Sequence, residues 1–441
     1  MKLLYMPLAI TAAITAGNVF ILQNSAILFD AKYGKSSSML NWFSFAVNAS
    51  LFLAILPAKL FKRFGAKNTL FIGGALLGGA HITAGVMLSL SSLSGTVSSF
   101  LLFLIAIVGG QGASIMFVSS IGYMAKYYSV LCTHLLNGIL FMYLFFSDSF
   151  HVVLKMGPLS SFSNTGFFFL IGAFTIGVGV ACAILFTKKD KSGKSVGNLA
   201  KAMVLRNILR LYTLLASIIL VLAIAFMITY QFYTSFAAKV LIFLVVLNFV
   251  VPLVALTLFK SEKAQSMFPS PSDQDRFIMQ KGSDVSFKKV KKSKEFVLLL
   301  LTFMIIIGVS RMVDENAQLI ALSNSSSSST NQTAFQVFRI LGCLLTGIVL
   351  ATFRLYLSPF ALMMIYSFFF AVAQVLMFFI QYSSLALYLA VIMVGFVQGG
   401  CFVLIGIIAH EEYGIKKYIK VVGYMLSAGA LGIFIFDMLI F

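Results

Sequence analysis

The feature that most constrains this chain is a series of apolar segments, each long enough to cross a bilayer. The segments are roughly 18 to 25 residues long, and about 20 apolar residues in a helix span the hydrocarbon core. Lipid offers no hydrogen-bond partners to the backbone, so only helices and closed barrels cross it. The segments lack the alternating pattern of barrel strands. We therefore predict an all-α polytopic membrane protein.

The composition agrees, because 60% of the residues are hydrophobic and only 10% are charged, against about 25% charged residues in soluble domains. About 13 spanning helices are expected from segments of this length. They cover residues 3–28, 39–58, 68–90, 98–124, 131–154, 166–187, 209–231, 237–259, 296–321, 334–353, 357–381, 385–409 and 421–440.

The basic residues predict the orientation of the chain. The formal net charge is +19, and with the N-terminus in the cytoplasm most Lys and Arg residues fall on cytoplasmic loops, as the positive-inside rule expects. The exceptions are Lys32, Lys35, Lys155, Lys239, Arg311 and Arg339. We therefore attribute the charge to topology and to contact with an anionic leaflet, not to nucleic acid. The protein is expected in the plasma membrane or an internal membrane.

The chain divides into three parts. Residues 1–187 form an N-terminal six-helix bundle, and residues 295–441 form a C-terminal bundle of five helices. Between them, residues 188–294 contain a basic linker, two extra helices and a polar cytoplasmic loop. Two helical sets around a central insertion are typical of transporters built from two homologous halves.

One loop carries a resemblance to a known family. Leu60, Arg63, Gly65 and Lys67 resemble the loop signature G-x-L-a-D-r-x-G-r-k of the major facilitator superfamily, whereas Lys62 stands where that family has Asp. The resemblance implies a two-bundle fold and a gating loop comprising Lys62, Arg63, Gly65 and Lys67. Because the family's Asp contributes to a cytoplasmic gate, Lys62 places the usual gating contact in question.

Three further stretches resemble the nodulin-like branch of that superfamily, which is related to the monocarboxylate porters. They are residues 15–20 (TAGNVF), 308–318 (GVSRMVDENAQ) and 411–418 (EEYGIKKY). The branch also implies the two extra helices between the halves. Its second half would finish with a sixth helix, whereas five are predicted here before Phe441. A truncated sequence, a segment that does not span, and a missing core helix all remain open explanations.

The sequence carries no catalytic set, so an enzyme is not expected. The four histidines and four cysteines are dispersed without the spacing of metal ligands or paired cysteines, and neither a cofactor nor a metal is predicted. The histidines are expected to be interfacial or hydrogen-bonded structural residues. They are His81, His134, His151 and His410.

Charged residues within apolar segments are the strongest functional signal. Arg311, Asp314, Glu315 and Gln318 recur at i, i+3, i+4 and i+7 and therefore share one face of a helix. Ionisable groups in a bilayer usually face partners or a water-filled path, because their burial is costly. Two interpretations stay open: Arg311 pairs with an acid of its own helix, or the face lines a central substrate cavity.

Three other polar residues join the predicted substrate site. The related monocarboxylate porters hold a substrate carboxylate with an Arg in the equivalent core helix, and Arg339 resembles it in approximate position. A guanidinium fork suits this task because it binds a carboxylate through two charge-assisted hydrogen bonds. A purely structural partner for Asp314 or Glu315 is the alternative role. Asn18 and Gln111, within the segments 3–28 and 98–124, are further expected lining residues.

Protons are a candidate coupling partner, with Asp314, Glu315 and Asp148 as the candidate coupling acids. Two N-x-[ST] sequons, at Asn324 and Asn331, lie in a serine-rich loop predicted on the outside, which is the side that permits glycosylation.

The prediction is a secondary active or facilitative transporter that moves a small organic solute, a carboxylate or an amino acid, by alternating access. A non-transporting membrane scaffold or receptor-like subunit with a transporter fold is the alternative. Lys62 and the missing last helix favour this alternative.

Overall fold

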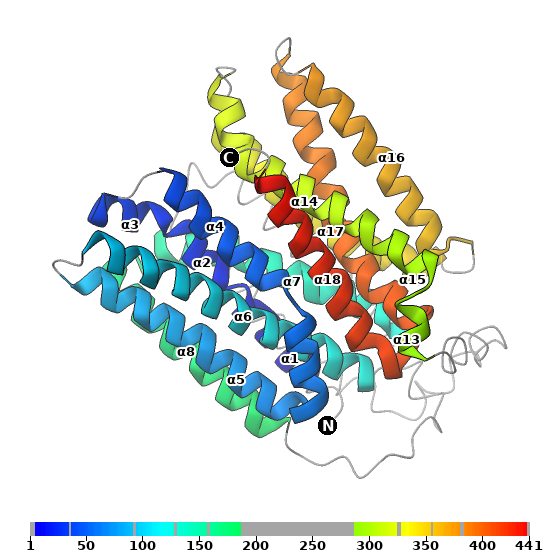
Figure 1. Ribbon diagram of the computed structural model, residues 1–441, viewed down its shortest axis with the longest axis horizontal. Coiled ribbons are helices and arrows are strands. Elements are labelled where there is room, and N and C mark those ends of the chain that lie inside the picture. The colour runs from blue at the N-terminus through cyan, green and yellow to red at the C-terminus, as the bar shows by residue number, and fades with distance from the viewer. Residues whose placement is uncertain are drawn as a thin grey trace, which may run out of the picture.

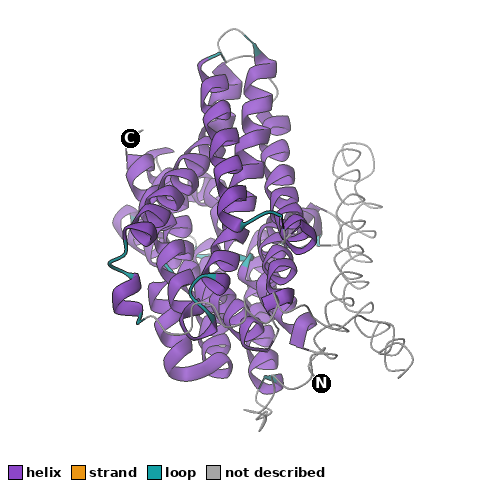
Figure 2. Cartoon of the chain, turned by 90° about the vertical axis from the view of Figure 1, so that its right-hand side faces the viewer, coloured by secondary structure: helices purple, strands orange, loops and turns teal. Residues whose placement is uncertain are grey.

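The computed structural model describes residues 5–34, 37–90, 94–127, 130–156, 159–186, 286–323, 328–353, 356–379 and 383–438. Within these ranges every regular element is a helix (Figure 2), so the prediction of an all-α protein is confirmed for them. The predicted helices 209–231 and 237–259 lie outside the described residues, as does Asn324.

The described helices follow in this order along the chain. They are α1 (Tyr5–Ala16), α2 (Val19–Asn24), α3 (Ala26–Tyr33), α4 (Ser37–Phe52), α5 (Ile55–Ser89), α6 (Gly95–Tyr127), α7 (Val130–Met156), α8 (Asn164–Leu185), α13 (Phe287–Val290), α14 (Lys294–Ser323), α15 (Ser328–Phe353), α16 (Pro359–Phe378), α17 (Ser384–Glu411) and α18 (Ile415–Met438).

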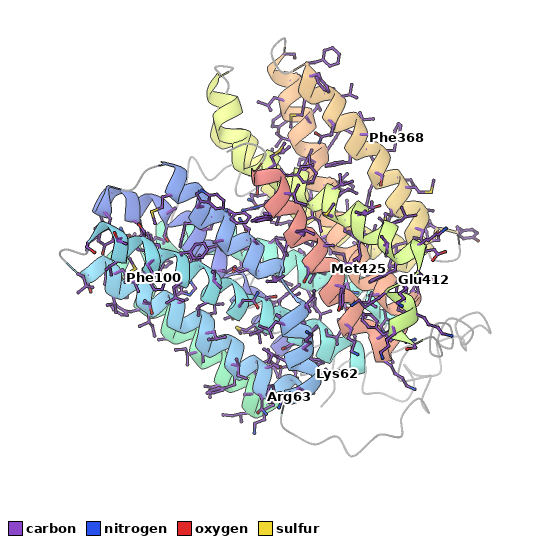
Figure 3. All side chains as sticks on the ribbon, in the orientation of Figure 1. Lys62, Arg63, Phe100, Phe368, Glu412 and Met425 are labelled. Carbon is purple, nitrogen blue, oxygen red and sulfur yellow. The ribbon has the colours of Figure 1, made fainter. Side chains whose placement is uncertain are left out.

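Within the described part of the chain, eight helices are long and apolar enough to cross a membrane, namely α5, α6, α8 and α14 to α18. Shorter apolar stretches at Leu8–Gln23, Trp42–Phe52 and His134–Ser147 coincide with three more predicted segments. Phe100 and Phe368, each 67% exposed, point outward from the bundles (Figure 3), as expected of side chains that face lipid. A multi-pass membrane protein is confirmed, and the number of about 13 spans stays a prediction.

The helices form two bundles, which we call the first half (α1 to α8) and the second half (α14 to α18) (Figure 1). In the first half α5 packs against α6 and α8, and in the second half α15 packs against α17 and α14 against α18. Between the halves, α7 contacts α15 and α17, while α18 contacts α4 and α5. The halves lie together at the end of the molecule where α8 ends and α14 begins, which we call the linker end, and diverge toward the opposite end (Figure 1).

Glycines bring several of these helices into backbone contact, the arrangement that small residues allow between membrane helices. A Cβ atom at Gly74 of α5 would lie 2.8 Å from the Cα of Gly179 in α8. Across the halves, a Cβ atom at Gly138 of α7 would lie 3.2 Å from the Cα of Gly347 in α15. A Cβ atom at Gly399 of α17 would collide with the carbonyl oxygen of Arg339 in α15. Three helix pairs are thus fixed at close range.

The predicted continuous helix 3–28 is wrong, because the structure divides it into α1, α2 and α3. At the first division the amides of Asn18 and Phe20 donate to the carbonyls of Thr15 and Gly17, each at 3.1 Å. These i to i−3 bonds tighten the turn as in a 3₁₀-helix. Glycine and asparagine are weak helix formers, which explains why the turn tightens here.

Two other predicted boundaries are corrected. The helix predicted for 39–58 ends at Phe52 and resumes at Ile55, and Gly65, with φ of 73°, separates that short stretch from the rest of α5. Only glycine adopts such a φ without steric cost. The span predicted for 334–353 coincides with the apolar span Ala334–Phe353, but its helix begins earlier, at Ser328. Asn331 therefore lies in a helix and not in a loop.

Candidate functional site

Arg339 of α15 is buried where the two halves meet. It is 1% exposed, and its guanidinium carbon lies 4.3 Å from the ring centroid of Phe145 in α7 and 5.9 Å from that of Phe20 in α2. Both rings belong to the first half, whereas Arg339 belongs to the second. A guanidinium over aromatic faces is attracted by their quadrupoles, more strongly where water is excluded. Arg339 therefore links the halves at the level of the predicted site.

One carboxylate lies between two arginines. Arg311 donates to Asp314 within α14, and Arg339 Nη1 lies 3.8 Å from the same Asp314 Oδ2. Arg339 also donates to the side-chain oxygen of Gln336 in its own helix. Arg311 is 4% exposed and Asp314 is 6% exposed, so neither charge reaches bulk water. We call Arg311, Asp314, Gln336 and Arg339 the Arg339 cluster; mutual pairing offsets much of the desolvation cost of its charges.

The contacts of the Arg339 cluster include features of both interpretations left open by the sequence, a structural ion pair and a polar site between the halves. Arg311 pairs with Asp314, as its structural interpretation expects. Arg339 approaches Asp314 and also reaches the aromatic rings of the other half. Glu315 and Gln318 in α14 and Asp148 in α7 have helical backbones, but their side chains lie outside the described residues. Their roles as binding or coupling groups stay predictions.

Asn18 lies inside the first half, away from the Arg339 cluster. Its side-chain amide donates to Thr175 Oγ1 of α8 at 2.9 Å. Its backbone carbonyl oxygen lies 3.1 Å from His81 Nε2 of α5, and His81 Nδ1 lies 2.8 Å from the Leu77 carbonyl oxygen. The tightened turn that contains Asn18 is thus held to α5 and α8. These contacts favour a structural role for Asn18 and His81.

Gln111 of α6 contacts the end of α4. Its Nε2 donates to the carbonyl oxygens of Ser50 at 2.7 Å and Leu53 at 3.1 Å. The last carbonyls of a helix have no partner within that helix and need one elsewhere, especially in lipid. Gln111 therefore stabilises the break between α4 and α5, and it does not contact the Arg339 cluster in the described structure.

The same break is stabilised from the second half. The backbone amides of Ala54 and Ile55 donate to Ser427 Oγ of α18, at 3.0 and 3.1 Å. These amides are the donors that a new helix leaves unpaired at its start. A side chain of one half thus satisfies the backbone of the other.

A cluster of aromatic rings lies beside the Arg339 cluster. The ring of Phe402 in α17 lies 4.8 Å from that of Phe52, 5.1 Å from that of Phe145 and 5.7 Å from that of Phe141, measured between centroids. We call these four residues the Phe402 cluster. Phe402 comes from the second half and the other three from the first. Because Phe145 also lies under Arg339, the two clusters share a side chain.

Two polar contacts join the halves nearer the linker end. His134 Nε2 of α7 lies 2.7 Å from Glu411 Oε1 of α17, and the two side chains are 1% and 11% exposed. Tyr418 of α18 donates to Asn137 Oδ1 of α7 at 3.0 Å. His134 lies about 16 Å along α7 from Phe145, at 1.5 Å per residue. These contacts therefore hold the halves together on the linker side of the Phe402 cluster.

This contact was not predicted from the sequence, in which His134 is one of several dispersed histidines and Glu411 belongs to a short motif. The spacing of His134 and Asn137, which places both on one helix face, was the available signal. Of the predicted gating loop, Lys62, Arg63 and Lys67 are exposed in the structure, and Gly65 forms the bend described above.

No family model and no curated protein matches this sequence. Solved structures do match the fold. The proton:xylose symporter XylE of the major facilitator superfamily, bound to 6-bromo-6-deoxy-D-glucose, aligns with a TM-score of 0.58 at 13% identity, over 99% of this chain and 88% of that chain.

A partially occluded inward-open XylE from E. coli aligns with a TM-score of 0.54 at 12% identity, over 99% of this chain and 93% of that one. The E. coli fucose:proton symporter FucP aligns with a TM-score of 0.52 at 11% identity, over 99% of this chain and 90% of that one. At such low identity the likeness concerns the fold and extends along both chains. The protein has the two-bundle fold of the major facilitator superfamily.

Proposed function

We propose that this protein is a secondary transporter that moves a small organic solute by alternating access, with the Arg339 cluster as its substrate site. The fold supports transport, because the solved structures that share it include proton-coupled sugar symporters. The observation that carries the proposal is the position of Arg339, a buried charge of one half that lies against aromatic rings of the other. The contacts of a site at this position change whenever the halves move apart.

The chemistry of the cluster favours a carboxylate as the substrate, with an amino acid as the second choice. Two guanidinium groups, those of Arg311 and Arg339, converge on the Asp314 carboxylate. A guanidinium binds a carboxylate with two parallel hydrogen bonds. The rings of Phe20 and Phe145 would pack against the apolar part of such a solute.

The contacts between the halves suggest which side of the site is closed. The Phe402 cluster and the pairs His134–Glu411 and Tyr418–Asn137 all lie between the Arg339 cluster and the linker end. We infer that the structure represents a conformation closed at the linker end. Opening that end requires both polar pairs to separate. The substrate site would then face the side of the membrane at the linker end.

Protons are the proposed coupling partner, and Asp314 is the candidate acid whose contacts are described. Its carboxylate holds Arg311 and approaches Arg339. Protonation of Asp314 would weaken both interactions. The guanidinium groups could then bind an incoming carboxylate. Because the proton on Asp314 and the substrate on the arginines would then be bound together, the movements of the proton and the substrate would be coupled.

The test is uptake of a panel of radiolabelled carboxylates and amino acids by the full chain in proteoliposomes. For the transported solute, Arg339→Lys is expected to reduce uptake at low concentration at least about tenfold, because lysine keeps the charge and loses the paired hydrogen bonds. The control is Lys294→Arg, which exchanges the same two side chains in the opposite direction at an exposed position and should change little.

Normal uptake by folded Arg339→Lys protein would place the substrate site elsewhere. If the unmodified protein carries none of these solutes under any ion gradient, the non-transporting scaffold becomes the better explanation.

A further inference from the structure

The halves also meet at a basic cavity near the linker end. The cavity has a volume of about 190 Å³ and is lined by Phe61, Lys62, Gly122, Ala125, Ile415, Lys416, Tyr418, Ile419 and Lys420. At the liquid volume of water, this space would hold roughly six molecules, and it therefore has room for a phosphate group. The first four residues belong to the first half and the others to α18 of the second half.

Positive charge converges on the cavity from both halves. Lys62 lies at the linker end of α5, beside α18 (Figure 3), and its ammonium group is close enough to interact electrostatically with that of Lys420. Lys416 is the third lysine of the lining, and no lining residue is acidic. Two carboxylates precede α18: Glu411 is bonded to His134 and Glu412 lies beside Tyr413, and neither lines the cavity. The ammonium groups of Lys62 and Lys420 repel each other unless an anion lies between them.

The backbone adds to the same field. The helix α18 has 24 residues and begins at Ile415, directly after Gly414, whose φ of 73° ends the preceding segment. Its first turn contributes Ile415 and Lys416 to the lining. The unpaired amides at the start of a long helix attract anions. The cavity thus combines a helix start with lysines from two elements.

One side of the cavity region is covered by the short helix α13. The Lys420 ammonium nitrogen lies 5.3 Å from the ring centroid of Phe287, and Phe287 packs against Tyr424 one turn further along α18. Lys291 donates to the hydroxyl of Tyr424 at 2.9 Å. These contacts hold Lys420 in place and add further basic residues near the cavity mouth.

We propose that this cavity binds a phosphate group, which bridges Lys62 of the first half to Lys416 and Lys420 of the second. Bound there, the anion offsets the repulsion between the lysines and stabilises the conformation closed at the linker end. A ligand that binds one of two conformations more tightly shifts the population toward it. The group comes from a free phosphate or from an anionic lipid headgroup, which share this chemistry.

The test uses the full chain in nanodiscs and measures its thermal unfolding midpoint, which rises when a ligand binds the folded protein. In one arm, inorganic phosphate is titrated into nanodiscs of phosphatidylcholine alone. In the other arm, phosphatidic acid is added to the nanodisc lipid. A rise in both arms supports the site with free phosphate as a ligand, and a rise only with phosphatidic acid supports it with the headgroup as the ligand.

The variant that tests the site replaces Lys62, Lys416 and Lys420 with glutamine. Its affinity for the phosphate source is expected to fall about 100-fold, at roughly fivefold for each lysine. The control replaces Lys59, Lys67 and Lys288, three exposed lysines outside the lining, and carries the same change in net charge. It is expected to bind within about twofold of the unmodified protein.

A third variant, with arginine at the three lining positions, keeps the charge and is expected to retain binding. It separates loss of the site from loss of folding. The proposal is overturned if no arm raises the midpoint, or if the control variant loses as much affinity as the lining variant. Neither result depends on substrate uptake, so failure of this site and failure of the transport proposal are distinguishable.

Discussion

His134 Nε2 in α7 and Glu411 Oε1 in α17 lie 2.7 Å apart, which makes them a nearly buried pair that joins the two halves. Phe402 of α17 lies between this pair and the Arg339 cluster, and its ring packs against Phe52 and Phe141 of the first half. It is 1% exposed. A cysteine that replaces Phe402 would therefore report on whether the halves separate here.

We predict that Glu411→Gln increases the rate at which a membrane-impermeant maleimide labels a cysteine introduced by Phe402→Cys, by about fivefold. A hydrogen bond to a charged group contributes about 1 kcal/mol more than one between neutral groups, and the variant loses this difference in the closed conformation. The background carries Cys132→Ser, Cys182→Ser, Cys343→Ser and Cys401→Ser. Glu412→Gln, the neighbouring acid, is the control and should leave the rate unchanged. Equal rates in all three proteins would mean that the pair does not hold the linker end closed.

The pair Arg311–Asp314 should behave as a coupled unit. Asp314→Asn alone removes the carboxylate beside two buried guanidinium groups. Removing one partner of a buried ion pair lowers the free energy of unfolding by about 3–5 kcal/mol. The double variant Arg311→Gln/Asp314→Asn is expected to lose less than the sum of the single variants, by at least about 1 kcal/mol. The free energy of unfolding in detergent measures this coupling. Additive losses would argue against the pairing, and the exposed residues Lys294 and Glu295 provide a matched cycle with no expected coupling.

Asn18 and Thr175 are predicted to contribute to stability and not to substrate affinity. Replacing either partner, by Asn18→Leu or Thr175→Val, should lower the free energy of unfolding by about 0.6–1.7 kcal/mol, the range found for hydrogen bonds between membrane helices. The concentration of solute at half-maximal uptake should stay within about twofold, because the pair lies away from Arg339. A large change in that concentration would support the prediction from the sequence that Asn18 lines the substrate site.

Glycine at position 399 is predicted to be required for the position of Arg339. In Gly399→Ala the new methyl group meets the carbonyl oxygen of Arg339, and such overpacking costs about 1–3 kcal/mol. The control is Gly79→Ala, whose Cβ meets nothing within 4 Å. Thermal unfolding should separate the two variants clearly. Equal midpoints would show that α15 and α17 are less closely packed than described.

The sequence predicted those features that depend on short separations along the chain. Apolar length predicts spanning helices, and the i, i+3 spacing of Arg311 and Asp314 places them on one face, where the structure pairs them. The position of Arg339 beside Asp314 was foreseen as an alternative. Its contact with Phe145 was not, because that contact depends on how two bundles meet.

Other predicted site residues have contacts that the sequence did not indicate. Asn18 was predicted to face the substrate from its depth alone, and in the structure its amide donates to Thr175 beside the tightened turn at Gly17. Gln111 was predicted to line the cavity, and in the structure it donates to carbonyl oxygens at the break after Phe52. That break has a sequence signal in Pro57, which has no amide hydrogen to donate to the Leu53 carbonyl, whereas the turn at Gly17 contains no proline. His134 and Glu411 are far apart in sequence, and only the packing of the halves brings them together.

The hydroxyl of Ser427 limits how the two halves can move relative to each other. The first half cannot complete its own backbone hydrogen bonds at Ala54 and Ile55, since their acceptor belongs to α18. Parting the two elements here would strand two peptide groups in hydrocarbon, at several kcal/mol each. We therefore expect the contact between Ser427 and the α4–α5 junction to persist during any rocking of the bundles, so that it acts as the pivot about which the linker end opens.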